Sequence, residues 1–229
     1  MELEIAPLAF YQVNRQAAER LYAEAAEFAG LTGKETVYDL YCGTGVIGLS
    51  MAHRAERIIG VEVISSAVEN AEKNARRNGI ENAVFYTADV AKVVSQLAVE
   101  YPPDVVLLDP PRKGCDPVVV ERIAQMNPSR IVMIACNPAS AARDCARLAE
   151  LGYTIDRIRP VDLFPRTGNV ETVVLLSKGE VDSKKIRVEF SLEDMDMSEI
   201  SGWGNLSADQ GVCVGAYRVK GVQPLYLTD

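Results

Sequence analysis

Short apolar runs alternate with longer amphipathic stretches along most of this chain. A continuous apolar run between chain breakers is typical of a buried strand, whereas apolar residues three and four apart indicate a helix. This pattern predicts strands at residues 36–41, 57–63, 83–88, 104–108, 130–136, 153–163 and 171–177. It predicts helices between them at 46–52, 65–78, 90–99, 117–125 and 140–150, and an earlier helix from a cap at Asn14 to about Gly30.

The order of these segments predicts an α/β fold. Strands that alternate with helices form a mostly parallel sheet with helices on both faces. The last two strands, 153–163 and 171–177, are joined by a connection too short for a helix, so one of them must run antiparallel. We therefore expect a seven-stranded, mostly parallel sheet whose last strand is antiparallel.

The pattern changes after Lys178. Residues 179–185 are polar and charged, residues 186–192 are compatible with one strand, and residues 203–229 are rich in glycine without a clear period. We therefore expect a functional domain over residues 1–178, followed by a C-terminal tail of uncertain fold over 179–229.

Composition narrows the class of protein. The 229 residues are 48% hydrophobic and 24% charged, which is typical of a soluble globular protein. No apolar run approaches the ~18 residues of a membrane helix. The acidic N-terminus has no signal-peptide pattern. We expect a cytoplasmic protein that does not contact membranes.

Cysteine and histidine usage argues against a metal centre. The five cysteines include no CxxC pair, which disfavours a disulfide framework, a structural zinc site or an iron–sulfur site. The single histidine, His53, excludes His-based triads and multi-histidine metal sites. We expect no metal.

The net charge of −8 limits how the chain binds nucleic acid. The acidic excess is shared equally between residues 1–178 and 179–229, so neither part has the broad basic surface of a self-sufficient nucleic-acid binder. If the substrate is a nucleic acid, many of the contacts with its phosphates must be made by groups outside this chain.

A cysteine stands where one buried strand ends. The apolar residues 131–135 lead into Cys136, Asn137 and Pro138, and the proline stops the strand. Cys136 therefore lies at the carboxyl edge of the sheet, where ligands bind in open α/β folds. Position alone leaves two readings open, a core cysteine or a functional thiol.

A glycine-rich loop follows the first strand. Gly43, Gly45 and Gly48 have the GxGxxG spacing, which allows a ligand to approach the backbone and fits NAD, FAD and S-adenosylmethionine alike. Asp39, just before the loop, suits a ligand that carries an ammonium group. Glu62, at the end of the second strand, is placed to accept hydrogen bonds from ribose hydroxyls. Nicotinamide enzymes also use an acidic residue at this position, so Glu62 does not distinguish between the cofactors.

Three further acidic positions follow strands or open them. Asp89 either faces an adenine amino group or caps the next helix. Asp109 begins a stiff Asp-Pro-Pro-Arg loop, in which Asp109 and Arg112 are placed to orient a planar heterocycle. Glu171 opens an apolar strand and is either an exposed strand end or a base held near the site.

Five motifs in order carry a family resemblance. They are Phe-x-Gln-x-Asn (10–14), Asp-Leu-Tyr-Cys-Gly-x-Gly (39–45), Asp-Pro-Pro-Arg-Lys-Gly (109–114), Cys-Asn-Pro (136–138) and Asn-Val-Glu-Thr (169–172). Over residues 8–178 the chain resembles the catalytic domain of the RNA uracil-5 methyltransferases, which modify 23S rRNA or the T-loop of tRNA. The resemblance implies a class I S-adenosylmethionine-dependent methyltransferase fold.

The resemblance also implies roles for individual residues. Cys136 would be the nucleophile and Glu171 the proton acceptor. Residues that would line the cofactor or base site are Gln12, Tyr41, Gly43, Gly45, Glu62, Asp89 and Asp109. The substrate would be a uridine in RNA, with 23S rRNA favoured over tRNA, and the product 5-methyluridine.

The chain departs from the family pattern at several points. Relatives usually have histidine where this chain has Arg166 and Asn169. Many relatives carry an N-terminal OB-like RNA-binding domain, some with cysteines that bind an iron–sulfur cluster. Because neither feature occurs here, we expect a fragment that lacks its RNA-gripping domain.

The chemistry explains why a thiol and a carboxylate would be needed. Carbon 5 of uracil becomes nucleophilic only when a thiolate adds to carbon 6, and a base must then remove the carbon-5 proton. Because the thiolate must be populated near pH 7, we expect a lowered pKa for Cys136.

Three other functions remain open from the residues. Asp-Pro-Pro motifs also serve methylation of exocyclic amines, which requires no cysteine. The glycine loop is compatible with a nicotinamide dehydrogenase. A non-catalytic module that binds S-adenosylmethionine or RNA is the third alternative.

Overall fold

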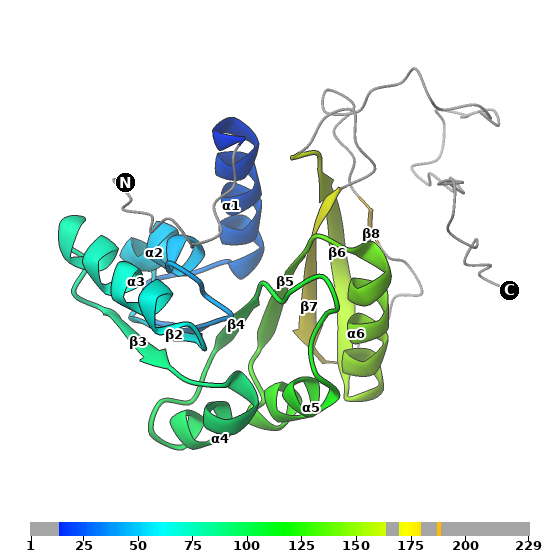
Figure 1. The fold of residues 1–229 in the computed structure, drawn as a ribbon. Coiled ribbons are helices and arrows are strands. Elements are labelled where there is room, and N and C mark those ends of the chain that lie inside the picture. The colour runs from blue at the N-terminus through cyan, green and yellow to red at the C-terminus, as the bar shows by residue number, and fades with distance from the viewer. Residues whose placement is uncertain (1–13, 164–169, 180–186, 189–229) are drawn as a thin grey trace, which may run out of the picture. The chain divides into compact units, whose positions relative to one another are not determined.

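The computed structural model describes residues 14–163, 170–179 and 187–188. Its helices are α1 (Arg15–Ala29), α2 (Val46–Met51), α3 (Ser65–Arg77), α4 (Val90–Glu100), α5 (Pro117–Met126) and α6 (Pro138–Glu150), with a 3₁₀ turn η1 (Ala52–Arg54). Its strands are β1 (Thr36–Leu40), β2 (Arg57–Glu62), β3 (Ala83–Thr87), β4 (Val105–Leu108), β5 (Arg130–Ala135), β6 (Tyr153–Val161), β7 (Glu171–Lys178) and β8 (Arg187–Val188). Figure 1 shows their arrangement.

The strands form one mixed sheet in the order β3-β2-β1-β4-β5-β7-β6-β8. Strands β1 to β5 pair in parallel, whereas β7 lies between β5 and β6 and is antiparallel to both. The predicted seven strands, with the last antiparallel, are confirmed. The short strand β8, which pairs in parallel with β6, adds an eighth within the stretch 186–192 where a strand was expected.

Helices cover both faces of this sheet (Figure 1). Alternate strand residues point to opposite faces of the sheet. The buried side chains therefore form separate core clusters on the two faces. One core cluster joins the sheet to α1 and α2, through residues such as Leu21, Val37, Ile47, Val132 and Val173. A second joins the sheet to α4, α5 and α6, through residues such as Tyr38, Val94, Val119, Met133 and Leu148. A third, smaller cluster packs α3 against β3, through Val68, Ala71 and Phe85.

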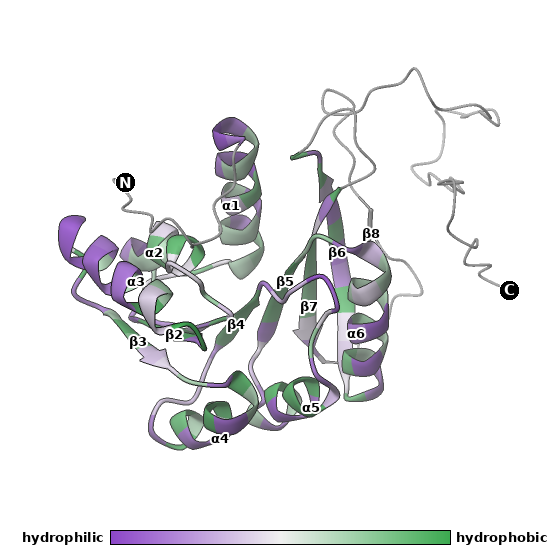
Figure 2. Cartoon of the chain, in the orientation of Figure 1, coloured by the Kyte–Doolittle hydropathy of each residue, from purple (hydrophilic) through white to green (hydrophobic). Residues whose placement is uncertain are grey.

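Burial of this apolar surface is the main stabilising contribution to the fold. The central strands are apolar on both faces. In β4, for example, every residue is buried. Figure 2 shows the hydrophobic colour concentrated on these strands and the hydrophilic colour on the outer sides of the helices. None of the helices in the described ranges is long and apolar enough to cross a membrane.

Helix α1 is fixed at both ends and along its length. The Asn14 side chain caps it by accepting a hydrogen bond from the Ala17 N–H, and Gly30 ends it in the left-handed conformation. Two ion pairs join the C-terminal half of α1 to β6. They link Arg157 to Glu27 at 3.1 Å and Arg159 to Glu24 at 2.6 Å.

Two predicted boundaries differ from the observed ones in an informative way. Helix α6 begins at Pro138 rather than at residue 140, because proline is well suited to the first helical position and Asn137 caps it. Strand β5 accordingly ends at Ala135, so Cys136 and Asn137 form the link between strand and helix.

Candidate active site

Four residues with reactive side chains share one face and one edge of the sheet. In the adjacent strands β1, β4, β5 and β7, buried residues that pack toward α1 and α2 mark this face: Val37, Leu107, Ile134 and Val173. The residues two positions nearer the carboxyl edge of the parallel strands are Asp39, Asp109, Cys136 and Glu171. Because side chains two positions apart point to the same face, these four side chains converge there.

Strand pairing brings the predicted nucleophile and base together. In the antiparallel register of β5 and β7, Ala135 lies opposite Thr172. The next pair toward the edge is Cys136 and Glu171. Directly opposite residues have Cβ atoms about 4.5–5.5 Å apart and point to the same side. Cys136 is half-buried and Glu171 is only 5% exposed.

The surroundings of Cys136 disfavour its thiolate. Burial raises the pKa of the thiol, the Glu171 carboxylate raises it further, and Asp109 adds to this; the Arg112 guanidinium acts in the opposite direction. The expectation of a lowered pKa for Cys136 is therefore wrong. The physical reason is that the half-buried thiol loses part of its solvation and that carboxylates lie beside it at the same edge.

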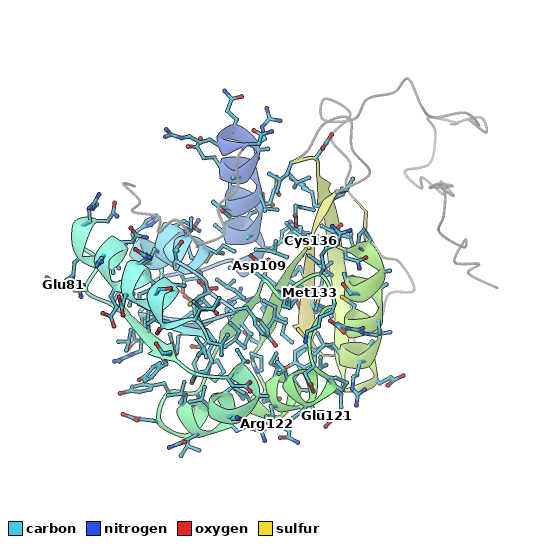
Figure 3. All side chains as sticks on the ribbon, in the orientation of Figure 1. Glu81, Asp109, Glu121, Arg122, Met133 and Cys136 are labelled. Carbon is cyan, nitrogen blue, oxygen red and sulfur yellow. The ribbon has the colours of Figure 1, made fainter. Side chains whose placement is uncertain are left out.

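The neighbouring carboxyl groups are also shifted toward their neutral forms. Burial raises the pKa of Glu171, and Arg112 opposes the shift. Burial, with the carboxylates of Glu171 and Asp39, raises the pKa of Asp109 to about 8. In Figure 3 Asp109 and Cys136 lie at the same end of the sheet, above Met133 of β5. These mutual effects are those expected of acidic side chains that share one edge of the sheet.

The loop after β4 is fastened to the start of α6. The Arg112 carbonyl accepts hydrogen bonds from the Asn137 amide and from the Ser140 hydroxyl, each at 3.1 Å. Asn137 meanwhile caps α6 with its side-chain oxygen, which accepts from the Ala139 N–H at 3.1 Å. One side chain next to Cys136 thus holds both the helix and the Asp-Pro-Pro-Arg loop in place.

The second turn of α6 completes this attachment. The Arg143 guanidinium donates to the Lys113 carbonyl at 2.9 Å, and the buried Asp144 carboxylate accepts from the Cys115 N–H at 2.7 Å. Gly114 lies between them at φ +81, and a Cβ there would be 2.4 Å from Arg143 and 2.5 Å from Asp144. The loop geometry therefore requires glycine at this position.

Sequence reasoning missed the three α6 residues Ser140, Arg143 and Asp144. The one local signal was an acidic residue within the apolar stripe of a predicted helix, since Asp144 is followed by Cys145 and precedes Leu148 on the same buried face. Their partners lie 28 to 30 residues earlier in the chain for Ser140 and Arg143, so no local pattern identifies the contacts.

The glycine loop is anchored by Glu62. Its carboxylate accepts hydrogen bonds from the backbone N–H groups of Gly43, Val63 and Ile64, at 3.2, 2.8 and 3.0 Å. Gly43 has φ +52 and open space where a side chain would point, so its backbone is accessible. At Gly45, by contrast, a Cβ would be 2.9 Å from the Phe85 ring, so this glycine is required by packing.

Asp39 lies beneath this loop and is fully buried. Its Oδ2 accepts a hydrogen bond from the Gly48 N–H at 2.9 Å, whereas its Oδ1 has no partner among the described residues. Burial raises the pKa of Asp39 to about 7; the bond from Gly48 opposes this shift and Glu62 adds to it. A buried oxygen without a partner is costly and calls for a ligand or water.

The other predicted cofactor residues are placed differently. Tyr41 has an unusual positive φ of 63°, and its half-buried ring packs against the core cluster on the α4–α6 face. Asp89 caps α4 by accepting from the Ala91 N–H at 2.9 Å, which is the structural alternative to a cofactor contact. Gln12, Arg166 and Asn169, like the tail beyond residue 188, lie outside the described residues.

Fold and site together define a class I S-adenosylmethionine-dependent methyltransferase fold. The precorrin-6y C5,15-methyltransferase of Geobacter metallireducens shares this fold, with a TM-score of 0.63 at 14% identity over 77% of this chain and 95% of that chain. The family model of the tRNA (uracil-5-)-methyltransferases matches residues 3–179. The chain belongs to this family.

Individual relatives agree with this assignment. An uncharacterised RNA methyltransferase of Enterococcus faecalis is 49% identical to this chain over 180 residues, which is 78% of the chain. An uncharacterised RNA methyltransferase of Clostridium acetobutylicum is 45% identical over 178 residues, or 77% of the chain. The chain spans 39% of the length of each. The tRNA (uracil-54, C5)-methyltransferase of Pyrococcus abyssi, solved with S-adenosyl-L-homocysteine, has a TM-score of 0.66 at 34% identity over 75% of this chain and 41% of that one.

Proposed function

We propose that the chain is the catalytic part of an RNA uracil-5 methyltransferase. It would transfer a methyl group from S-adenosylmethionine to carbon 5 of a uridine through a covalent bond between Cys136 and carbon 6. The observation that carries the proposal is the pairing of β5 with β7, which sets Cys136 opposite Glu171 on one face of the sheet. A core cysteine would not require a buried carboxylate as its neighbour.

The residues of the β1–α2 and β2–α3 connections fit the cofactor. The open backbone at Gly43 accommodates close approach of a ligand. The Glu62 carboxylate is held rigidly by backbone N–H groups and retains lone pairs for ribose hydroxyls. The unpartnered Oδ1 of Asp39 is suited to a positively charged group, directly or through water. When bound, the cofactor supplies an electrophilic methyl group on a sulfonium.

Cys136 performs the first step. Its thiol proton leaves to water, and the sulfur forms a bond to carbon 6 while the C5–C6 π electrons move onto the ring as an enolate. Carbon 5 is then electron-rich and takes the methyl group. The half-buried position of Cys136 serves this step, because the sulfur is accessible from the carboxyl edge of the sheet.

Glu171 performs the last step. Its carboxylate removes the carbon-5 proton, the C5–C6 double bond re-forms, and the sulfur leaves carbon 6 as a thiolate. Burial makes Glu171 a stronger base than an exposed glutamate, because its pKa is raised.

The substrate must be an unstacked uridine. A base within a helix cannot reach a strand edge, so the target must be flipped out at a cost of a few kcal/mol. We favour 23S rRNA as the target and retain tRNA as the alternative, since the family description and the Pyrococcus abyssi relative both name tRNA. Either RNA places the proposed activity in the cytoplasm. Phosphate contacts from outside this acidic chain would supply much of the affinity.

Two variants test the division of roles. Cys136→Ala should lose methylation of 23S rRNA or tRNA by at least about a thousandfold, while the dissociation constant for S-adenosylmethionine stays unchanged in calorimetry. Glu171→Gln should methylate the base and then accumulate a protein–RNA adduct, visible on denaturing gels. Turnover by Cys136→Ala would contradict the covalent route and favour methylation of an exocyclic amine.

A further inference from the structure

The proposed chemistry, on which this inference rests, requires a thiolate in a site that disfavours one. Three charged side chains act on Cys136 from the elements packed around it: Glu171 from β7, Asp109 from the end of β4, and Arg112 from the loop that follows. Two of these are acids and oppose a second negative charge. Arg112 is the cation of this group, and it acts on Glu171 as well.

The backbone of Arg112 is held directly beside Cys136. Its carbonyl receives hydrogen bonds from Asn137, the residue after Cys136, and from Ser140 in the first turn of α6. The next residue, Lys113, is held by Arg143. The backbone from which the Arg112 side chain extends is therefore fixed against the start of α6, two residues after Cys136.

We propose that Arg112 is a positioning residue that favours the thiolate of Cys136 and the carboxylate of Glu171 and so readies both for their steps. The loop attachment to Asn137 and Ser140 holds it in this place. Its positive charge offsets the negative charge that develops during the reaction. The one covalent change it promotes is loss of the Sγ proton to water.

Arg112 matters at both ends of the catalytic cycle. Before addition it offsets the repulsion between the sulfur and the two carboxylates. After the carbon-5 proton moves to Glu171, the departing sulfur becomes a thiolate again, and the same cation favours its departure. A residue that only packed the loop would affect neither charge.

The test measures the thiol without RNA. The full chain is treated with iodoacetamide from pH 6 to 10, and alkylation of the Cys136 peptide is followed by mass spectrometry, which separates it from the buried Cys42, Cys115 and Cys145. The variants are Arg112→Met and Arg112→Lys. Lys113→Met is the matched control, because it removes one exposed positive charge from the same loop.

Arg112→Met should move the midpoint of the alkylation profile upward by about one pH unit, which slows alkylation at pH 7 about tenfold. Arg112→Lys should restore most of the rate, and Lys113→Met should match the unaltered chain. In 1 M salt the difference should shrink, because the charges are partly exposed. Unchanged thermal unfolding of Arg112→Met verifies that the loop stays folded.

Coinciding profiles of Arg112→Met and the unaltered chain would overturn the inference, as would an equal shift in Lys113→Met. The alkylation result tests the role of Arg112 independently of the proposed methyltransferase function. Methylation by Cys136→Ala refutes the covalent route whatever the alkylation profile shows. Loss of methylation in Cys136→Ala with an unshifted profile in Arg112→Met refutes only the role of Arg112.

Discussion

At the scale of single residues, buried carboxyl groups dominate the electrostatics of the site. Asp39 is 0% exposed and has one oxygen without a partner in the described part of the chain, and burial helps to raise the pKa of its neighbour Asp109 to about 8. Both would be far more stable in water as anions. The fold therefore holds protons or unpaired charge in the place where a cationic cofactor would bind.

The pH dependence of the unfolding free energy tests whether the folded protein holds a proton on Asp39. Its folded pKa of about 7 lies above its ordinary value of 3.8, so the folded state binds a proton that the unfolded state releases. Stability from Asp39 is therefore complete below about pH 4 and is lost as pH rises to about 7. Asp39→Asn retains an oxygen to accept the Gly48 N–H and removes the titration.

Urea unfolding at pH 4 and pH 8 measures the effect. Between these values the unaltered chain should lose roughly 3 kcal/mol of unfolding free energy relative to Asp39→Asn. The comparison with the variant cancels the contributions of carboxyl groups whose pKa does not depend on Asp39; Asp109, whose pKa Asp39 raises, adds to the difference in the same direction. A difference between the two proteins that is the same at both pH values would show that Asp39 does not titrate in this range.

The sequence predicted that Cys136 and Glu171 lie on neighbouring strands, but not their charge states. Cys136 and Glu171 were placed by strand ends and by the short connection before the last strand, both of which are local features. The shift of the Cys136 pKa depends on burial and on Asp109 and Arg112, which lie more than 20 residues away in the chain. No local pattern reports that environment.

At the scale of elements, the attachment of the β4 loop to α6 positions the reactive groups. The contacts from Asn137, Ser140, Arg143 and Asp144 hold residues 112–115 against the helix that follows Cys136. The Asp-Pro-Pro-Arg motif alone suggested a stiff loop. The structure shows that the stiffness comes equally from contacts with a helix distant in sequence.

Gly114→Ala tests this attachment. At φ +81 its Cβ would contact the side-chain ends of Arg143 and Asp144 far inside normal distances, so these side chains must give up their bonds to the loop or the loop must shift away from α6. We expect a loss of about 2–3 kcal/mol of unfolding free energy and a larger loss of methylation. Gly79→Ala is the matched control, since Gly79 also has a positive φ, +64, but open space around it.

Chemical denaturation and methylation assays of both variants separate the two effects. Gly79→Ala should cost about 1 kcal/mol through backbone strain alone and leave methylation intact. If Gly114→Ala behaved like Gly79→Ala in both assays, the loop attachment would have no role in positioning Arg112 or Asp109.

At the scale of the whole molecule, hydrophobic periodicity predicted the sheet well. All seven main strands and six helices were expected from the sequence, because buried parallel strands and amphipathic helices have distinct periods. The two-residue strand β8 lies within residues 186–192, which the pattern gave as compatible with a strand, whereas residues 203–229 have no clear period and no fold could be predicted for them. The division at residue 178 thus remains a prediction.

A shortened chain tests that division. A protein that ends at Gly179 retains all three core clusters and, among the described residues, loses the two-residue pairing of β8 with β6. We expect its unfolding midpoint to stay within about 4 °C of the full chain, with unchanged affinity for S-adenosylmethionine. A fall of the midpoint by more than about 10 °C would show that residues 180–229 belong to the folded domain.

The covalent bond between Cys136 and a uracil base is the central claim, and RNA that carries 5-fluorouridine tests it most directly. Because the Glu171 carboxylate cannot remove fluorine as a proton, the thiolate cannot leave and the adduct should persist through denaturation. Mass spectrometry after nuclease digestion should find the modified, methylated nucleotide on the Cys136 peptide. A chain that methylates ordinary uridine but yields no adduct, or an adduct at another residue, would contradict the account.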